Sequence, residues 1–369
     1  MAIETNEFIQ SRLDKLAAIR ESGTDPYPPG TPERVPVQEL RETGETEEAM
    51  ASSGRIMAKR KHGKTVFCDL ADPTGRIQLF INRKIIGEEG WELLGNIDLG
   101  DLVWVSGPLF VTRTGELSVK VTELVLLTKS VRPMPVVKTD SDGQVHDAVS
   151  DPDFLYRHRC IDLLLNPETT SRFRARSRII SAARRYLDEN GFLEVETPVL
   201  QQIYGGAAAD PFVSHYNSLD QEVYLRIATE LYLKRLVAGG FHRVYEIGKD
   251  FRNEGIDRTH SPEFTQLELY EAWTDYNGMM ERFEGIVSAA AQAAGAGETV
   301  VFRGQEINLS PPFRRIPFVP TLHEKSGEEL FSWPVEELAT LAKKLGLGDD
   351  EKDRPTLLDK LFDHFVTPE

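Results

Sequence analysis

Five short segments between residues 53 and 127 constrain the fold of this chain most strongly. Each reads as a strand, and turn residues separate neighbouring segments at 72–75 (Asp-Pro-Thr-Gly) and 112–115 (Thr-Arg-Thr-Gly). The expected strands begin at 54–58 and continue at 65–69, 76–81, 103–110 and 116–127. Residues 85–94, between the third and fourth strands, read as a helix. The order of three strands, a helix and two strands predicts a small β-barrel.

This order is that of an OB-fold, which binds single-stranded nucleic acid across its second and third strands. Phe67, Gln78 and Phe80 fall on those strands, and Glu123 falls on the last one. An aromatic ring on the outer surface stacks an unpaired base with a gain of about 1 to 3 kcal/mol. Alternate strand residues must instead face the barrel core, so the sequence leaves both positions open for each ring.

Charge is unevenly distributed along the chain. The formal net charge is −16, which opposes nucleic-acid binding, because phosphate contact is driven by cationic side chains and counterion release. Between residues 55 and 64, however, no acidic residue occurs among the basic residues Arg55, Lys59, Arg60, Lys61 and Lys64. This strip fits phosphate contact by Arg60 and Lys64, or a solvated strand edge that lysines protect from pairing.

A second constrained region is the hairpin expected over residues 251–270. Arg252 and Glu254 are two residues apart on an expected strand, so their side chains should point to the same side. After a loop over 255–262, a second strand presents four side chains on one face: Phe264, Gln266, Glu268 and Tyr270. Such a hairpin can hold a phosphate, stack a purine and bind an ammonium group. An ordinary charged hairpin is the alternative interpretation.

The run over residues 251–264 (FRNEGIDRTHSPEF) resembles motif 2 of class II aminoacyl-tRNA synthetases. Residues 177–200 resemble motif 1, and the segments 205–212 and 226–234 resemble the lysyl-tRNA synthetase forms. The resemblance covers residues 13–369 and implies an α+β fold, with a five-stranded OB-fold barrel before an incomplete class II antiparallel β-sheet domain flanked by helices. The boundaries that we expect are a helical extension over 1–50, an anticodon-binding OB-fold over 51–132, a linker over 133–160 and a catalytic domain with a helical insertion over 161–369.

The resemblance implies a two-step reaction. ATP first activates L-lysine to lysyl-adenylate, with Mg²⁺ accompanying ATP, and the lysyl group is then transferred to tRNA-Lys. Arg252 matches the catalytic arginine that bridges the lysine carboxylate and the α-phosphate. Glu254 would accept from the adenine amino group, Phe264 would stack on the ring, and His260 would approach the terminal phosphates. Such catalysis acts by positioning and charge stabilisation, without a protein nucleophile.

The resemblance also assigns the amino-acid pocket and the anticodon surface. Glu230, Glu268 and Tyr270 match the residues that bind the cationic side chain of lysine. Gly206 would permit close backbone approach to the substrate α-ammonium group. A capped turn for the glycine and surface charge for either glutamate are the alternatives. On the barrel, four positions match those that read a uridine-rich anticodon: Arg60, Phe67, Gln78 and Glu123.

The predicted helix over 171–190 and the strand over 192–199 that follows it correspond to motif 1. Ile179, Ile180, Ala183 and Leu187 lie at helical spacing and form one apolar face. The family uses this helix and strand as a twofold interface, so the resemblance implies a homodimer. Periodicity alone equally permits an intramolecular core contact.

The chain departs from the family in its last residues. No Gly-Leu-Gly-hydrophobic-Asp-Arg segment occurs, so motif 3 is absent, and with it the arginine that grips the γ-phosphate and the acidic Mg²⁺ ligands. We therefore expect a fragment with no metal ligands of its own and no readily measurable adenylate synthesis. An aspartyl- or asparaginyl-tRNA synthetase and a non-catalytic tRNA-binding protein are the alternative functions.

Cysteine content and hydropathy argue against disulfides, Cys/His metal sites and membrane segments. Cys68 and Cys160 stand alone, so neither a disulfide nor a Cys/His metal site is expected. The sequence contains no run of eighteen apolar residues and begins with an acidic segment. These features predict a soluble, cytoplasmic protein with no membrane partner.

Overall fold

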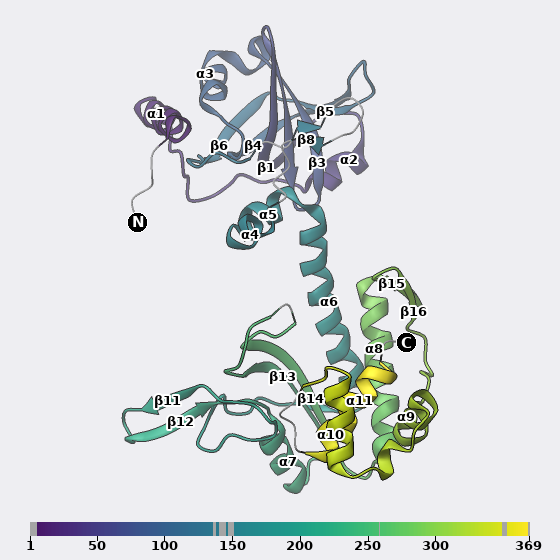
Figure 1. The fold of residues 1–369 in the computed structure, drawn as a ribbon. Coiled ribbons are helices and arrows are strands. Elements are labelled where there is room, and N and C mark those ends of the chain that lie inside the picture. The colour runs from purple at the N-terminus through teal and green to yellow at the C-terminus, as the bar shows by residue number, and fades with distance from the viewer. Residues whose placement is uncertain are drawn as a thin grey trace. The chain divides into compact units, whose positions relative to one another are not determined.

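The computed structural model describes residues 6–135, 151–257, 259–348 and 353–367, and the backbone of 138–139 and 145–146. It divides into two compact units, Met1–Pro167 and Glu168–Glu369, and most of their helices and strands are labelled in Figure 1. Much of the polar stretch in the predicted linker 133–160 lies outside the described residues. Within the described residues, every helix is too short or too polar to cross a membrane.

The N-terminal unit is built around a β-barrel. Its helices are α1 (Glu7–Glu21), α2 (Val37–Thr43), α3 (Arg83–Asn96), α4 (Pro152–Arg157) and α5 (Arg159–Leu165). Its strands are β1 (Thr46–His62), β2 (Thr65–Asp72), β3 (Gly75–Asn82), β4 (Leu102–Val111), β5 (Leu117–Lys120), β6 (Glu123–Thr128), β7 (Lys138–Thr139) and β8 (Val145–His146). The helix α3 lies between the third and fourth strands, as the sequence predicted.

Strand pairing closes the barrel. β1 pairs with β2 and β4, β3 pairs with β2 and in parallel with β5, and β5 pairs with β4. The predicted last strand over 116–127 is divided into β5 and β6, because the intervening amides bond to different strands. Val121 donates to the Phe80 carbonyl at 3.0 Å, and Thr122 donates to the Ser106 carbonyl at 2.8 Å. The predicted OB-fold barrel is confirmed.

The C-terminal unit combines small sheets with helices. Its helices are α6 (Pro167–Glu189), α7 (Glu230–Ala238), α8 (Tyr276–Ala294), α9 (Phe318–Ser326), the 3-10 helix η1 (Leu330–Ser332), α10 (Val335–Lys344) and α11 (Arg354–Phe365). Its strands are β9 (Leu193–Glu194), β10 (Leu200–Gln201), β11 (Val213–Tyr216), β12 (Gln221–Leu225), β13 (Arg243–Phe251), β14 (Glu263–Glu271), β15 (Thr299–Phe302) and β16 (Gln305–Asn308).

The longest pairing of this unit joins β13 and β14 in antiparallel register along their full length, and β9 pairs in parallel with β13. The strand predicted over 192–199 is therefore shorter than expected. The amide of Val195 still donates to the Tyr245 carbonyl at 2.9 Å, but that of Thr197 donates to the Glu246 carboxylate at 3.1 Å. The ladder ends because a side chain replaces the backbone acceptor.

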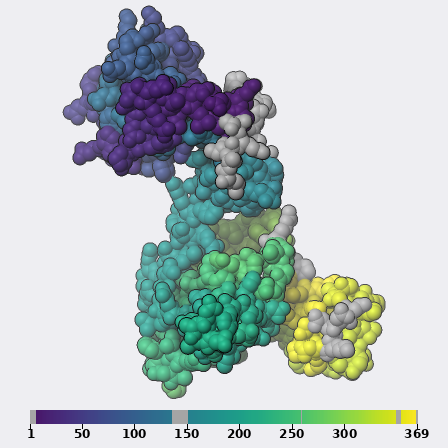
Figure 2. Space-filling model, turned by 90° about the vertical axis from the view of Figure 1, so that its left-hand side faces the viewer, coloured from purple at the N-terminus to yellow at the C-terminus, as the bar shows by residue number. Residues whose placement is uncertain are grey.

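Separate apolar clusters support the sheet and the later helices. Leu187, Phe192 and Tyr245 pack together between α6 and β13. A second cluster joins α9, η1, α10 and α11 through Leu322, Leu330, Leu338, Ala342, Leu357, Leu358 and Leu361. In the space-filling view, the residues of α10 and α11, coloured yellow, form one compact group (Figure 2).

Candidate active site and nucleic-acid interface

The register of β13 and β14 determines which side chains share a face. Val244 pairs with Tyr270, Glu246 with Glu268, and Asp250 with Phe264. Side chains alternate along a strand, so the even-numbered residues of both strands lie on one face. This arrangement agrees with the predicted face of the second strand.

Arg252 and Glu254 do not lie on the strand, so that expectation was wrong. β13 ends at Phe251, and the pairing extends by one bond, from the Arg252 amide to the Pro262 carbonyl at 2.9 Å. The next amide, of Asn253, donates instead to the Asp210 carbonyl at 2.8 Å, which turns the chain away from β14.

The two groups after the strand have distinct environments. The Arg252 guanidinium lies over the Phe264 ring, 5.0 Å from its centroid. Its Nε atom is buried and has no hydrogen-bond partner within the described part of the chain. Glu254 is exposed, and its carboxylate accepts from the Asp210 amide at 3.1 Å. The site therefore pairs an arginine with an aromatic face that an aromatic base could also use.

His260 lies in the exposed loop after Arg252. Its Nδ1 atom is 2.7 Å from the Asp257 carboxylate. The pKa of Asp257 is well below its usual range, because the Thr259 amide donates to the carboxylate and His260 donates through its side chain and backbone. The loop is thus folded around one carboxylate, with the His260 ring at the surface.

Three predicted lysine-binding residues meet at the start of α7. Gly206 has a φ of +91°, and a Cβ atom placed there would lie 2.7 Å from the Glu230 Cβ. Glu230 is the first residue of α7, and its carboxylate accepts from Lys234 Nζ at 2.6 Å. The hydrogen bond from Lys234 lowers the pKa of Glu230, and a side-chain hydrogen bond from Tyr270 contributes in the same direction. Burial raises the pKa of Tyr270.

Glu268 lies beside this group. Its Oε1 atom accepts from Gln266 at 2.8 Å and from the Thr229 amide, one residue before α7, at 3.3 Å. Its Oε2 atom and the Thr229 hydroxyl are buried without a hydrogen-bond partner among the described residues. Unpaired buried polar atoms cost free energy, so they mark a place that suits a polar ligand.

The sequence analysis missed a buried charge cluster on the same face. Arg226 is 2% exposed and contacts the carboxylates of Glu246 and Asp250, which are 4% and 0% exposed. The available signal was the alternation of Glu246, Gly248 and Asp250 along the strand, in register with the predicted face of β14. Burial raises the pKa of Asp250 to about 6, against the opposing effect of Arg226.

The outer face of the barrel carries the predicted anticodon residues. Val66, Cys68, Ile77 and Leu79 are buried, so the alternating Phe67, Gln78 and Phe80 face outward and are half-buried. The Phe67 and Phe80 rings meet edge to face at 5.5 Å, and Phe80 meets Phe110 at the same distance. Both rings therefore lie on the outer face of the barrel and not in its core.

Polar groups surround these rings. Arg60 pairs with Asp69 at 2.7 Å and lies opposite Phe67 across β1 and β2. The Gln78 carbonyl accepts from the Ser118 hydroxyl at 3.0 Å, and Glu123 is exposed at the start of β6. A hollow of about 520 Å³ is lined by Arg41, Arg60, Asp69, Arg76, Ile77, Gln78, Thr114 and Glu116.

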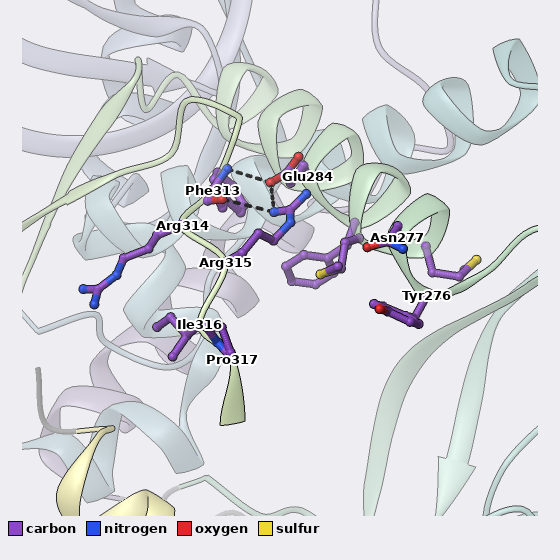
Figure 3. Close-up of a pocket in the computed structure, with 11 residues that line it drawn as sticks. Tyr276, Asn277, Glu284, Phe313, Arg314, Arg315, Ile316 and Pro317 are labelled. Carbon is purple, nitrogen blue, oxygen red and sulfur yellow. Dashed lines mark hydrogen bonds and ion pairs between the residues drawn. The ribbon is translucent and has the colours of Figure 1, made fainter. Parts of the chain in front are cut away.

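A larger hollow, of about 770 Å³, lies between the start of α8 and residues 313–317 (Figure 3). At its edge, Glu284 accepts from the Phe313 amide at 2.6 Å and also bonds to Arg315. None of the predicted site residues lines it. In the described ranges, no group of three or more His, Cys, Asp or Glu side chains could hold a metal ion.

Comparisons with known proteins agree with this geometry. Residues 53–127 match the family described as OB-fold nucleic acid binding domain, and residues 151–358 match tRNA synthetases class II (D, K and N). The lysine–tRNA ligase of Thermoanaerobacter pseudethanolicus is 42% identical over 368 residues, which are 98% of this chain and 72% of that protein. The chain belongs to the lysine–tRNA ligase family. The ligase of Clostridium novyi is also 42% identical, over 98% of this chain and 71% of its own length. The ligase of Clostridium perfringens is 43% identical over 96% of this chain and 71% of its own length.

Membership of the lysine–tRNA ligase family confirms the resemblance and the fold class predicted from the sequence. It is a family of enzymes that use ATP as a substrate, together with an amino acid and tRNA. The relatives named above carry the lysine ligase name and favour that interpretation over the aspartyl and asparaginyl alternatives.

Proposed function

We propose that the chain holds the L-lysine, ATP and tRNA-Lys sites of an enzyme that activates L-lysine with ATP and transfers the lysyl group to tRNA-Lys. The observation that carries this proposal is the convergence of Gly206, Glu230, Glu268 and Tyr270 beside the Arg252 and Phe264 pair. These residues offer two carboxylates and a phenol to a long cationic side chain, next to a guanidinium for a carboxylate and a phosphate. The arrangement suits condensation of a cationic amino acid with a nucleotide.

Each group has a role in this proposal. Glu230, Glu268 and Tyr270 bind the substrate ε-ammonium, while the backbone at Gly206 meets the α-ammonium. Arg252 holds the lysine carboxylate against the α-phosphate and stabilises the charge that develops during in-line attack. Phe264 stacks on adenine, Glu254 accepts from the adenine amino group, and His260 approaches the terminal phosphates.

Mg²⁺ accompanies ATP at sites of phosphoryl and nucleotidyl chemistry. We propose that Mg²⁺ enters the site with the phosphates of ATP. Every role proposed for this chain is performed by its own side chains and backbone groups.

The barrel is the proposed anticodon-binding domain, over 51–132, with a helical extension over 1–50, a linker over 133–160 and the catalytic domain over 161–369. Phe67 stacks an anticodon base, Gln78 and Glu123 contact base edges, and Arg60 contacts phosphate. Arg60 would exchange its partner Asp69 for a phosphate. Because charging of tRNA supplies the ribosome, the proposed location is the cytoplasm.

We further propose a homodimer through the motif 1 region. The predicted apolar face of α6 divides, because Ala183 and Leu187 are buried within the unit while Ile179 is 37% exposed. Residues after the helix add further exposed apolar side chains, namely Leu193, Val199, Leu200 and Ile203. Exposed apolar side chains are typical of protein interfaces.

Substitution of Glu230 by Gln tests the substrate assignment. The variant should weaken L-lysine binding, measured by calorimetry on the 369-residue chain, by about 100-fold or more. The reason is that the substrate ammonium loses one of its two carboxylate partners. ATP binding should change little, because Glu230 faces the amino acid.

Glu263→Gln is the matched control, since Glu263 lies on β14 and its side chain forms an exposed pair with Lys249, at 3.2 Å. It should bind lysine like the parent protein. Calorimetric titration of ATP into the parent and both variants provides the second measurement. Unchanged lysine affinity in Glu230→Gln, or equal binding of aspartate by the parent, would contradict the proposal.

A further inference from the structure

Arg226, Glu246 and Asp250 have no role in the mechanism described above. With Arg252 and Glu268, which that mechanism uses, they form a five-residue charge cluster beside the lysine pocket. Its members come from four places: Arg226 precedes α7, Glu246 and Asp250 lie on β13, Glu268 lies on β14, and Arg252 follows β13. Two guanidinium groups and three carboxylates give the fully ionised cluster a net charge of −1. A buried site with unbalanced charge favours a ligand of the opposite sign.

Arg226 is held firmly in this cluster. Its Nε atom donates to the Lys249 carbonyl at 2.9 Å, and Nη1 donates to the Thr197 carbonyl at 3.2 Å and to Glu246. The guanidinium lies on Gly248, where an added Cβ atom would be 2.1 Å from Nη2. The missing side chain at Gly248 is therefore what allows one arginine to reach both Glu246 and Asp250.

The two carboxylates differ in how well they are satisfied. Glu246 accepts from Arg226 and, through Oε2, from the Thr197 hydroxyl at 2.7 Å. Asp250 is fully buried and lies 3.0 Å from Arg226 Nε, yet neither of its oxygens makes a well-directed hydrogen bond within the described residues. Both carboxylate oxygens of Asp250 can therefore accept further hydrogen bonds, and the net negative charge of the cluster favours a cation beside them.

Arg252 is the group that Asp250 can orient. It is two residues from Asp250, and its buried Nε atom also lacks a hydrogen-bond partner in the described ranges. An unpaired donor and an unpaired acceptor at the same end of one strand can orient each other electrostatically.

We propose that Asp250, held by Arg226, is a positioning residue that orients Arg252 and must be ionised for the site to take up a cationic amino acid. This inference rests on the proposed lysine-activating function and adds a proton-linked requirement to it. Protonated Asp250 leaves the cluster neutral, so the charge that attracts the substrate is lost.

The groups that face Asp250 determine the sign of the pH dependence. Burial, Glu268 and Glu246 raise the pKa of Asp250, whereas Arg226 and Arg252 lower it, and the result is about 6. A bound cation stabilises the ionised form and lowers the pKa further. Lysine binding should therefore weaken as pH falls through about 6 and should release protons near that pH.

The test is calorimetric titration of L-lysine into the 369-residue chain at pH 7.5 and pH 5.5. For a free-state pKa of about 6, the parent should bind about fourfold more weakly at pH 5.5. At pH 6, titrations in two buffers of different ionisation enthalpy should reveal release of about half a proton. Asp250→Asn should bind more weakly than the parent at pH 7.5 and should lose both the fourfold change and the proton release.

Glu271→Gln is the matched control. Glu271 lies on the opposite face of β14, with its side chain 6% exposed, and it pairs with Arg243 at 2.7 Å and Arg282 at 3.0 Å. Its loss should reduce stability but leave the pH dependence of lysine binding intact.

Three results would overturn the inference. One is an Asp250→Asn protein that retains the fourfold change in lysine affinity between pH 7.5 and pH 5.5. Another is the absence of proton release when the parent binds lysine at pH 6, a measurement that requires no variant. Failure of the parent to bind lysine at pH 7.5 would overturn the proposed function and this inference with it. The first two results leave the proposed function intact, so the two failures are distinguishable.

Discussion

At the scale of single residues, Gly206 and Asp250 show how backbone freedom and burial shape the proposed amino-acid pocket. Gly206 combines a left-handed φ of +91° with close packing against Glu230. A side chain there would be strained and would also displace the first turn of α7. The glycine therefore sets the distance between its loop and the Glu230 carboxylate.

Gly206→Ala should destabilise the C-terminal unit by about 2 kcal/mol and weaken lysine binding, because left-handed strain and overlap with Glu230 add together. Urea denaturation and lysine calorimetry measure the two effects. Gly255→Ala is the control, since no atom lies within 4 Å of an added Cβ at that position and its φ is not positive. Similar losses in both variants would show that Gly206 has no special role.

Asp250 should also influence stability in a pH-dependent way. Its folded-state pKa of about 6 is above the ordinary value of 3.8, so protonation of Asp250 stabilises the folded state. This contribution to the free energy of unfolding is fully present below pH 3.8 and is lost as pH rises through about 6. From pH 5 to pH 7.5, the free energy of unfolding of Asp250→Asn should therefore rise relative to the parent by about 1 kcal/mol. Paired urea denaturation at both pH values checks this, and a difference that falls with pH would contradict it.

At the scale of elements, the pairing of β2 with β3 places alternate side chains on the outer face of the barrel. Core residues such as Cys68 and Leu79 occupy the inner positions, so Phe67 and Phe80 are left on the outside with their rings in contact. The two rings are partly buried by each other and by Phe110, which holds them in place for stacking.

Phe67→Ala should weaken binding of a uridine-rich anticodon stem-loop by about 1 to 3 kcal/mol, because a stacked base loses its platform. Fluorescence anisotropy at fixed ionic strength provides the measurement. Phe8→Ala is a suitable control, since Phe8 lies on α1 and is 72% exposed. Arg60→Ala should mainly reduce the salt dependence. An unchanged affinity of the Phe67 variant would exclude this surface as the anticodon site.

At the scale of the whole molecule, exposed apolar side chains on and after α6 support the proposed dimer. Ile203 is 72% exposed and Leu200 is 49% exposed, although both belong to a unit that buries similar residues elsewhere. Such surface is more stable when covered by another protein surface.

Replacement of both Leu200 and Ile203 by Asp should shift the chain from dimer to monomer, because two like charges would be brought close to their symmetry mates in a twofold interface. Sedimentation equilibrium measures the mass directly. Val301→Asp, at a 76% exposed position on β15, should leave the oligomeric state unchanged. A parent protein that sediments as a monomer at micromolar concentration would contradict the dimer proposal.

The sequence by itself determined the barrel, the second strand of the hairpin and the family. Alternation and turn residues are local signals, and the segments 65–69 and 76–81 are found within β2 and β3. The motif residues Arg252, Glu230 and Glu268 were likewise identified without coordinates, because their types and spacing carry the resemblance.

Only the tertiary structure decided which face of each strand is buried and which distant groups meet. The outward position of Phe67 depends on closure of the barrel, and β13 ends before Arg252 because Asn253 bonds to Asp210 in another segment. Arg226 and Asp250 are 24 positions apart in the chain, and they meet because Gly248 has no side chain to block the guanidinium. Local patterns record side-chain periodicity, whereas burial and hydrogen-bond partners depend on segments far away in the sequence.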